Sequence, residues 1–386
     1  MNLFLNQKLR VLLTGRLGWL MLVCWLAWIS PATAREMRIS VQQGQSQLAI
    51  GSSTPAKILD GSGNLLGQLP ELQGYFATPT NNAVNLADQQ AWRLTVKPAD
   101  DGFIYIGNRW YRGSVSLIHT GEGIMAINHV DLEDYLASVV GKEAYTSWPQ
   151  EVLKAQAVAA RSFALYRSQR QNSSLFDLGN TQTYQVYTGI EGEAPSTHAA
   201  VQATIGQVLT HGGKLVEAVF HANSGGHTEH SENVWKSVTP YLRGVPGFDE
   251  DGRNYQWTES LTATEIKQKL PGVGNIRTIQ PLGKTFTGRI KNVQIVGDSG
   301  SRTITGRELR KALGLKSTLF EITPQPELVA SQAGSSAPSS FQITGKGHGH
   351  GLGMSQWGAF AMAKQGKTYQ EILQHYYKGT SLAEYE

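Results

Sequence analysis

The chain has 386 residues, with 34 lysines and arginines against 30 aspartates and glutamates, a formal charge of +4 and one cysteine. At roughly 150 residues per domain, this length predicts two or three domains, or one large one. A single cysteine excludes an internal disulfide, a CxxC redox pair and a zinc cage of several thiolates. Charged residues make up 17% of the chain and hydrophobic residues 40%, which excludes a disordered acidic or basic protein.

The first 34 residues have the pattern of a secretory signal peptide. Basic residues, the last of them Arg16, precede an apolar run from Leu17 to Ile29, and an A-x-A cleavage site ends at Ala34. The apolar run is shorter than the ~20 residues that span a membrane, so we expect cleavage after Ala34 and no permanent anchor. A retained anchor is the alternative. The only cysteine, Cys24, would leave with this peptide.

Cleavage would leave 352 residues with 31 basic against 30 acidic side chains, a net charge of +1. The basic character of the chain therefore belongs mainly to the export signal. A nucleic-acid-binding surface has no support from the composition. We expect an exported, monomeric protein of the periplasm or cell wall that binds no nucleic acid.

The N-terminal part after the signal, residues 35–110, is predicted to be rich in β-strands. Short runs of alternating apolar and polar residues there are separated by Gly, Pro and Asn. Over residues 132–140 the apolar residues recur with the spacing of an amphipathic helix. We expect this helix to have Asp131 as its N-cap and to end at Gly141.

The rest of the chain alternates helices and strands. A capping box from Ser147 to Gln150 predicts a helix that runs to about Arg167. Further elements are expected as helices at 195–204, begun by Pro195, at 264–270 and at 306–313, and as strands at 215–220 and 291–296. Two C-terminal helices are expected, one after Ser355 and one that starts with a capping box of Thr368 and Glu371. Residues 326–340, rich in Ser, Ala and Pro, predict an irregular insertion. The fold class is α+β, with a mixed domain of helices and antiparallel sheet at 111–386.

Glycine alternates with other residues from Gly345 to Gly353. In an extended chain, one face of this run would carry only hydrogens, so another backbone or a flat ligand could approach it closely. His348 and His350 would project from the other face. A packed strand and one wall of a site both fit this pattern. Ser355 is expected to cap the helix that follows, where free amides could also bind an anion.

Three histidines lie within ten residues, at His221, His227 and His230, just after a predicted strand. Neutral imidazoles bind zinc, so His221 and His227 are candidate metal ligands. The segment lacks a third, well-spaced ligand, and histidines of this kind are more often hydrogen-bonded loop residues. Both interpretations remain open on the sequence.

Glu143 lies between two predicted helices, close to Tyr145 and Trp148. Desolvation at such a junction would raise the pKa of its carboxyl group, which suits a general acid. Lys154 and Arg161, seven positions apart on the second helix, share a face and would pair with Glu143 or with substrate. Several aromatic residues belong either to the core or to a surface that stacks on sugar rings: Trp148, Tyr187, Trp235, Tyr241, Trp257 and Trp357.

Several blocks of the chain, in order, resemble the SpoIID/LytB family, named for a sporulation cell-wall protein and an amidase enhancer. The matching blocks are Tyr135–Glu143, Trp148–Ala164, Gln185–Gly189, His221–Thr228, Thr305–Leu315, Gly347–Ala359 and Tyr376–Thr380. They extend from about 110 to the end of the chain.

The resemblance implies a lytic transglycosylase that cleaves peptidoglycan glycan strands stripped of their stem peptides. The family's catalytic glutamate maps onto Glu143, which would protonate the glycosidic oxygen and then help to remove the C6 hydroxyl proton as a 1,6-anhydro ring closes. This chemistry needs no second carboxylate, unlike that of most glycosidases. The residues expected to bind substrate are Lys154, Arg161, Tyr187, Ser224, His227, Trp235, His350, Ser355 and Gln356.

The chain departs from the family pattern in two places. Lys142 and Ala144 flank Glu143, where relatives usually have a small residue and then Met or Leu, and an inward Lys142 would lower the pKa of Glu143. Some relatives hold zinc with cysteines near the His221 loop, but this chain has Ser224 there, so no cofactor is expected. Two other functions remain open: a non-catalytic glycan-binding protein that enhances a cell-wall amidase, and a histidine-based metal hydrolase.

Overall fold

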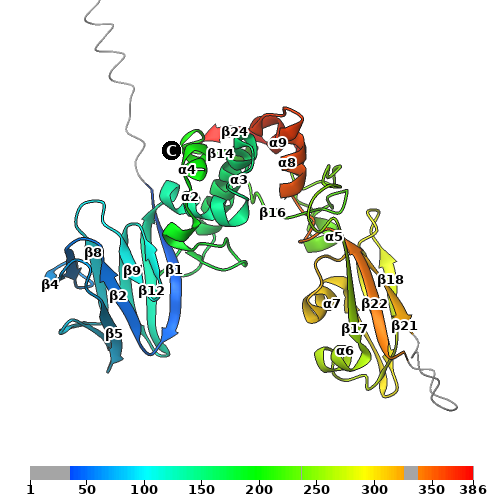
Figure 1. Cartoon of the computed structure of the whole chain (residues 1–386), viewed down its shortest axis with the longest axis horizontal. Helices are drawn as coiled ribbons and strands as arrows, with labels where there is room; N and C mark the ends of the chain where they lie inside the picture. Colours follow the sequence, from blue (N-terminus) through cyan, green and yellow to red (C-terminus); the bar gives the residue numbers. More distant parts are fainter. Residues whose placement is uncertain (1–34, 236, 326–337, 386) are drawn as a thin grey trace, which may run out of the picture. The chain divides into compact units, whose positions relative to one another are not determined.

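The computed structural model describes residues 35–235, 237–325 and 338–385, and Figure 1 shows the chain coloured along its sequence. The predicted signal peptide and most of the predicted insertion at 326–340 lie outside these residues. The fold is α+β, as predicted. None of the helices in the described ranges has both the length and the apolar character that a membrane crossing requires.

Two sheets form the N-terminal part (Figure 1). One has seven strands in the order β13-β1-β12-β11-β8-β3-β4, and the other has six in the order β10-β9-β2-β5-β6-β7. The strands are β1 (Glu36–Gln45), β2 (Leu48–Ser52), β3 (Ala56–Leu59), β4 (Leu65–Leu69), β5 (Tyr75–Thr80), β6 (Ala83–Leu86), β7 (Gln89–Ala91), β8 (Arg93–Pro98), β9 (Ile104–Ile106), β10 (Arg109–Tyr111), β11 (Ser114–Thr120), β12 (Gly123–Asp131) and β13 (Leu178–Gly179).

The domain boundary predicted between 110 and 111 is wrong, because one sheet crosses it. β12 pairs with β1, and β11 pairs with β8, so strands from both sides of the boundary complete the same ladder. Buried side chains of both sheets, among them Ile39, Ile50 and Val96, belong to one hydrophobic core. That core also includes Tyr135 and Leu136 of the first long helix, so the sheets and the helices are packed together.

The helices α2 (Leu132–Glu143), α3 (Gln150–Ser168) and α4 (Pro195–Gln202) follow the sheets. Asp131 caps α2, as predicted, since its carboxylate accepts a hydrogen bond of 2.8 Å from the backbone N–H of Glu133. Gly141 does not stop α2. A Cβ at this position would lie 2.0 Å from the carbonyl oxygen of Gly192, so the glycine instead allows the 3₁₀ turn Gly189–Gly192 to contact the helix closely.

Two other sequence predictions about this part are wrong. α3 has Pro149 as its N-cap and no side-chain cap bond, so the box predicted from Ser147 to Gln150 does not form. The strand predicted at 215–220 is interrupted, because 216–219 forms local turn bonds between two short strands. These two strands are β15 (Lys214–Leu215) and β16 (Phe220–His221).

A second core lies between α3 and the C-terminal helices α8 (Gln356–Lys364) and α9 (Tyr369–Tyr376). The capping box predicted at Thr368 forms at the start of α9. β16 pairs in parallel with β23 (Met354–Ser355), which brings the His221 loop beside the start of α8. The remaining elements here are β14 (Gln207–His211), β24 (Ser381–Glu384) and the single turn α5 (Glu232–Trp235).

Residues 256–346 have a core of their own, built from two three-stranded sheets and two helices. The helices, α6 (Ala263–Lys269) and α7 (Gly306–Leu313), lie where the sequence predicts them. The sheets have the orders β17-β22-β21 and β18-β19-β20. Their strands are β17 (Gln256–Thr262), β18 (Ile276–Lys284), β19 (Ile290–Gly297), β20 (Gly300–Thr305), β21 (Phe320–Gln325) and β22 (Ser340–Lys346).

Candidate active site

Glu143 is the last residue of α2, and its side chain is half-buried. Its Oε1 accepts a hydrogen bond of 3.0 Å from the backbone N–H of Val186. Burial raises the pKa of the Glu143 carboxyl, and the Val186 N–H partly opposes that rise. Among the described residues no cation contributes to this shift, and Lys142 is exposed. The inward lysine considered from the sequence is therefore not present.

Gln356 fixes the backbone at the same point. Its Nε2 donates to the carbonyl oxygen of Glu143 at 2.8 Å and to Oε1 of Gln156 at 3.2 Å. Because Gln356 begins α8, these bonds join the end of α2 to the start of a helix that lies 213 positions away in the chain. The backbone that carries the Glu143 side chain is thereby fixed between two helices with buried faces, α2 and α8, and does not belong to a free loop.

Aromatic side chains gather at this junction. The ring centroids of Trp148 and Trp357 are 5.1 Å apart, and the ring of Tyr145 lies 5.2 Å from Trp148 and 6.1 Å from Trp357. Tyr145 is 48% exposed, and both tryptophans are half-buried. Flat apolar rings at the junction of α2, α3 and α8 are well suited to the apolar faces of a sugar.

Ser355 and Asp249 order the segment that precedes α8. Ser355 caps the helix, as predicted, and its hydroxyl donates a hydrogen bond of 2.6 Å to Oδ2 of Asp249. Asp249 is buried and also accepts hydrogen bonds from the backbone N–H groups of Ser224 and Gly226. It therefore ties the His221 loop to α8. Asp249 could not be predicted from the sequence, since neither periodicity nor a motif distinguishes it from the exposed acidic residues Glu250 and Asp251.

The alternating glycines lie against other parts of the protein. A Cβ at Gly345 would meet the ring of Trp257 at 2.2 Å, and one at Gly351 would meet the guanidinium of Arg289 at 2.5 Å. From Gly347 onward the glycines of the run have positive φ angles, so the segment is a looped chain and not the extended strand that was expected. Close packing explains these glycines, and the glycine face is not an open site wall.

His221 and His350 lie together, with 5.4 Å between their ring centroids, and the ring of Trp235 is 6.5 Å from His350. Burial lowers the pKa of both histidines, to about 4 for His350, so both are neutral near pH 7. Nδ1 of His221 lies 3.0 Å from the carbonyl oxygen of Leu352, which leaves only Nε2 as a free ring nitrogen.

His227 occupies a separate place. Its ring packs edge-on against the exposed Phe286 at 5.3 Å, and its Nδ1 is 2.7 Å from the carbonyl oxygen of Thr228. Across the described residues, no three His, Cys, Asp or Glu side chains converge where a metal ion could bind. The arrangement of His221 and His227 thus does not fit a zinc site. No hydrogen bond or ring contact in the described ranges joins Glu143 to His227 or His350.

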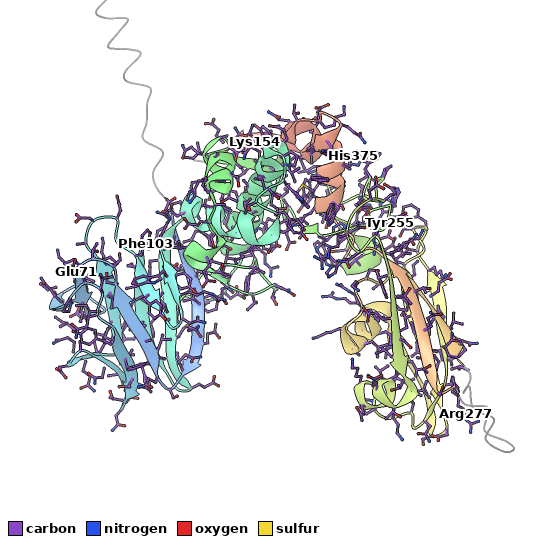
Figure 2. All side chains as sticks on the ribbon, viewed as in Figure 1. Glu71, Phe103, Lys154, Tyr255, Arg277 and His375 are labelled. Atoms are coloured by element: carbon purple, nitrogen blue, oxygen red, sulfur yellow. The ribbon has the colours of Figure 1, made fainter. Side chains whose placement is uncertain are left out.

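Two predicted substrate-binding residues, Lys154 and Tyr187, are engaged by other parts of the protein. Lys154, labelled in Figure 2, forms a 2.7 Å ion pair with Glu151 one turn earlier on α3. Tyr187 is fully buried, and its hydroxyl donates to Oδ1 of Asn128 at 2.7 Å. Tyr187 therefore belongs to the core, the alternative considered from the sequence.

Arg161, a third predicted substrate-binding residue, is also fully buried. Its guanidinium forms a two-point ion pair with the carboxylate of Glu133 and donates to the carbonyl oxygen of Gln207 at 3.0 Å. It therefore connects α3, α2 and the start of β14, and it presents no donor to solvent. The expectation that Arg161 meets substrate is corrected by this burial.

Comparison with known proteins places the chain in a family. A family model described as Stage II sporulation protein (SpoIID) matches residues 120–211, and one described as a domain of unknown function (DUF8618) matches residues 227–353. The chain is 35% identical to an uncharacterized protein of Brachyspira hyodysenteriae over 290 residues, which cover 74% of this chain and 75% of that protein.

Two relatives with descriptive names come from Bacillus subtilis. Stage II sporulation protein D is 35% identical over 281 residues, 67% of this chain and 76% of its own length. The amidase enhancer is 31% identical over 296 residues, 65% of this chain and 40% of its own length. The match from β12 through α2 and α3 includes the segment that carries Glu143. The chain belongs to the stage II sporulation protein D (SpoIID) family.

Proposed function

We propose that this protein is a lytic transglycosylase that cleaves the glycan strands of peptidoglycan, with Glu143 as its general acid and base. The observation that carries the proposal is the desolvated carboxyl of Glu143, which pairs with no cation of the described residues and whose helix ends at a junction of aromatic rings. A carboxyl group whose pKa is raised by burial keeps its proton at a higher pH than an exposed one, as a general acid must.

The proposed reaction uses this one carboxyl group twice. Protonated Glu143 gives its proton to the glycosidic oxygen between N-acetylmuramic acid and N-acetylglucosamine, and the bond from C1 to that oxygen breaks. The resulting carboxylate accepts the proton of the C6 hydroxyl as O6 bonds to C1. The products are a 1,6-anhydro end and a free hydroxyl, so no water is consumed and Glu143 returns to its acid form. General acid and base catalysis of this kind contributes roughly 10²–10⁴-fold.

Val186 and Gln356 have supporting roles in this reaction. The Val186 N–H, which donates to Oε1 of Glu143, would stabilise the carboxylate in the interval between the two proton transfers. Gln356 holds the carbonyl group of Glu143 itself, so it would keep the carboxyl aligned with the scissile bond. The proposal includes export across the cytoplasmic membrane, for which the basic and apolar pattern of residues 1–34 is the support.

A second candidate function is favoured by one comparison. The relative named amidase enhancer matches 65% of this chain, so a glycan-binding protein that assists a cell-wall amidase is the alternative. Such a protein would use the same aromatic surface without any need for the raised pKa of Glu143.

One experiment separates these functions. The purified protein is incubated with peptide-stripped glycan strands, and the products are analysed by mass spectrometry. Fragments with 1,6-anhydro ends are expected, and a chelator is expected to leave their rate unchanged. Bound but intact strands would favour the enhancer, and cleavage that the chelator abolishes would favour a metal hydrolase.

A further inference from the structure

A pocket of about 280 Å³ adjoins Trp357. Its walls come from two segments, 248–252 and α8 along its length to the C-cap, and include the rings of Phe248, Trp357 and Phe360 together with Asp251 and Lys364. The volume is close to the lower bound of ~300 Å³ for ligand pockets, which fits a single sugar residue and not an oligosaccharide.

The loop that forms one wall is held in a strained conformation. Phe248 has a φ angle of 55°, a left-handed value that a bulky side chain rarely adopts, and it is nevertheless 41% exposed. The three hydrogen bonds accepted by the carboxylate of the next residue, Asp249, anchor the chain there. The ring of His375, labelled in Figure 2, lies 5.1 Å from that of Phe248 on its α9 side. The fold thus keeps an aromatic ring at the rim of the pocket instead of burying it.

The wall formed by Trp357 of α8 is also held in place by close packing. A Cβ at Gly252 would lie 2.6 Å from Cγ of Trp357, so the indole rests directly on the loop backbone. The same indole contacts Trp148 and Tyr145, whose rings belong to the junction beside Glu143. One continuous set of aromatic rings therefore extends from the pocket to the segment between α2 and α3, which begins directly after Glu143.

Two charged groups of the pocket are available to a ligand, whereas the carboxylate of Asp249 is buried and hydrogen-bonded. Lys364 and Asp251 are both exposed, and within the described ranges neither side chain has an ion-pair or hydrogen-bond partner. An N-acetylated amino sugar offers apolar ring faces to the aromatic rings and hydroxyl groups to Asp251. A muramic residue without its stem peptide also carries a free lactyl carboxylate, the complement of an unpaired ammonium.

We propose that this pocket holds one N-acetylmuramic acid residue of the strand, with its ring against Trp357 and Phe360 and its lactyl carboxylate paired with Lys364. The inference takes its substrate class from the proposed function. A stem peptide turns the lactyl carboxylate into an amide and removes its charge. Lys364 is therefore a specificity-determining residue that favours stripped strands over strands that still carry peptides.

The test measures binding by isothermal titration in the Glu143→Gln background, so that strands are not consumed. Two probes are compared: peptide-stripped glycan, and the same strands after their lactyl carboxylates have been converted to methylamides. Lys364→Met is expected to weaken binding of the stripped strands about fivefold and to leave binding of the methylamide strands unchanged. Lys364→Arg should restore binding. Lys311→Met, which removes an exposed lysine of α7 that is not part of the pocket, is the matched control and should have no effect.

Phe248→Ala provides a second variant, which should weaken binding of both strands because it removes the aromatic side chain at the rim of the pocket. Three results would each overturn the inference: equal binding of the two strands by the Glu143→Gln protein, unchanged binding of stripped strands after Lys364→Met, or no binding of stripped strands at all. The outcome is distinguishable from that of the proposed function. If binding depends on Lys364 but the protein never cleaves glycan, the pocket proposal stands and the proposed enzymatic function is wrong. If cleavage depends on Glu143 but Lys364 has no effect on binding, the proposed function stands and the pocket proposal is wrong.

Discussion

Oε1 of Glu143 accepts a hydrogen bond of 3.0 Å from the backbone N–H of Val186, 43 positions further along the chain. This neutral donor stabilises the carboxylate form of Glu143, but its effect on the pKa is smaller than that of desolvation, so the pKa of Glu143 remains raised. Glu143 is thus placed to give up a proton and to take one back.

The first prediction concerns the pH dependence of cleavage. Because the reaction begins with protonated Glu143, kcat should be constant at low pH and fall as pH rises through the raised pKa of this group. The midpoint of the descending limb is expected above the ordinary value of 4.5. A pH–rate profile on stripped glycan measures it. A limb centred at or below 4.5 would contradict the desolvated acid.

The second prediction concerns stability. The pKa of Glu143 is raised in the folded state, so ionisation above that pKa costs folding free energy, and this cost is absent below the unfolded value of 4.5. Glu143→Gln, which keeps an acceptor for Val186, should therefore raise the free energy of unfolding at pH 7 but not at pH 4. Urea denaturation at the two pH values is the measurement. Glu122→Gln, at an exposed glutamate, is the control and should change neither value. Equal stability of Glu143→Gln and the parent at pH 7 would mean that the carboxyl is well solvated.

The third prediction concerns alignment. Gln356→Leu removes the 2.8 Å hydrogen bond to the carbonyl oxygen of Glu143, so we expect kcat to fall by about 10–100-fold while KM changes little. Steady-state kinetics on stripped glycan, normalised to folded protein, provide the test. Gln202→Leu changes an exposed glutamine of α4 and should leave both constants as they are. A change confined to KM would show that Gln356 binds substrate instead of positioning the acid.

The fourth prediction concerns the packing of α2. Gly141→Ala would place a Cβ 2.0 Å from the carbonyl oxygen of Gly192, and the free energy of unfolding should fall by about 1–3 kcal/mol as the backbone moves apart. Gly121→Ala, where a Cβ would meet nothing within 4 Å, is the matched control and should change stability little. If both variants unfold alike, Gly141 is not required for close contact.

The features that could be predicted from the sequence are those determined within one or two helical turns. The cap of α2 by Asp131, the Pro195 start of α4 and the capping box at Thr368 all depend on neighbours in the chain, and all three were predicted correctly. Glu143 was predicted as a candidate acid because it lies between two helices, and its carboxyl group is desolvated in the structure.

The features that could not be predicted depend on contacts between distant residues. The periodicity of α2 makes Gly141 resemble a helix stop, whereas its role is set by Gly192 on another segment. From the sequence, Arg161 resembles a cation that binds substrate. In the fold it is buried and forms an ion pair with Glu133, which belongs to another helix. Asp249 has no local signal at all, because its hydrogen-bond donors come from Ser224, Gly226 and Ser355.

The measurement that tests the central claim most directly is the cleavage of peptide-stripped glycan by Glu143→Gln. Mass spectrometry should find 1,6-anhydro fragments with the parent protein and a rate lower by roughly 10²–10⁴-fold with the variant. Circular dichroism and binding of the same strands should show that the variant is folded and still recognises glycan. Undiminished release of anhydro fragments by Glu143→Gln would contradict the assignment of Glu143 as the general acid and base.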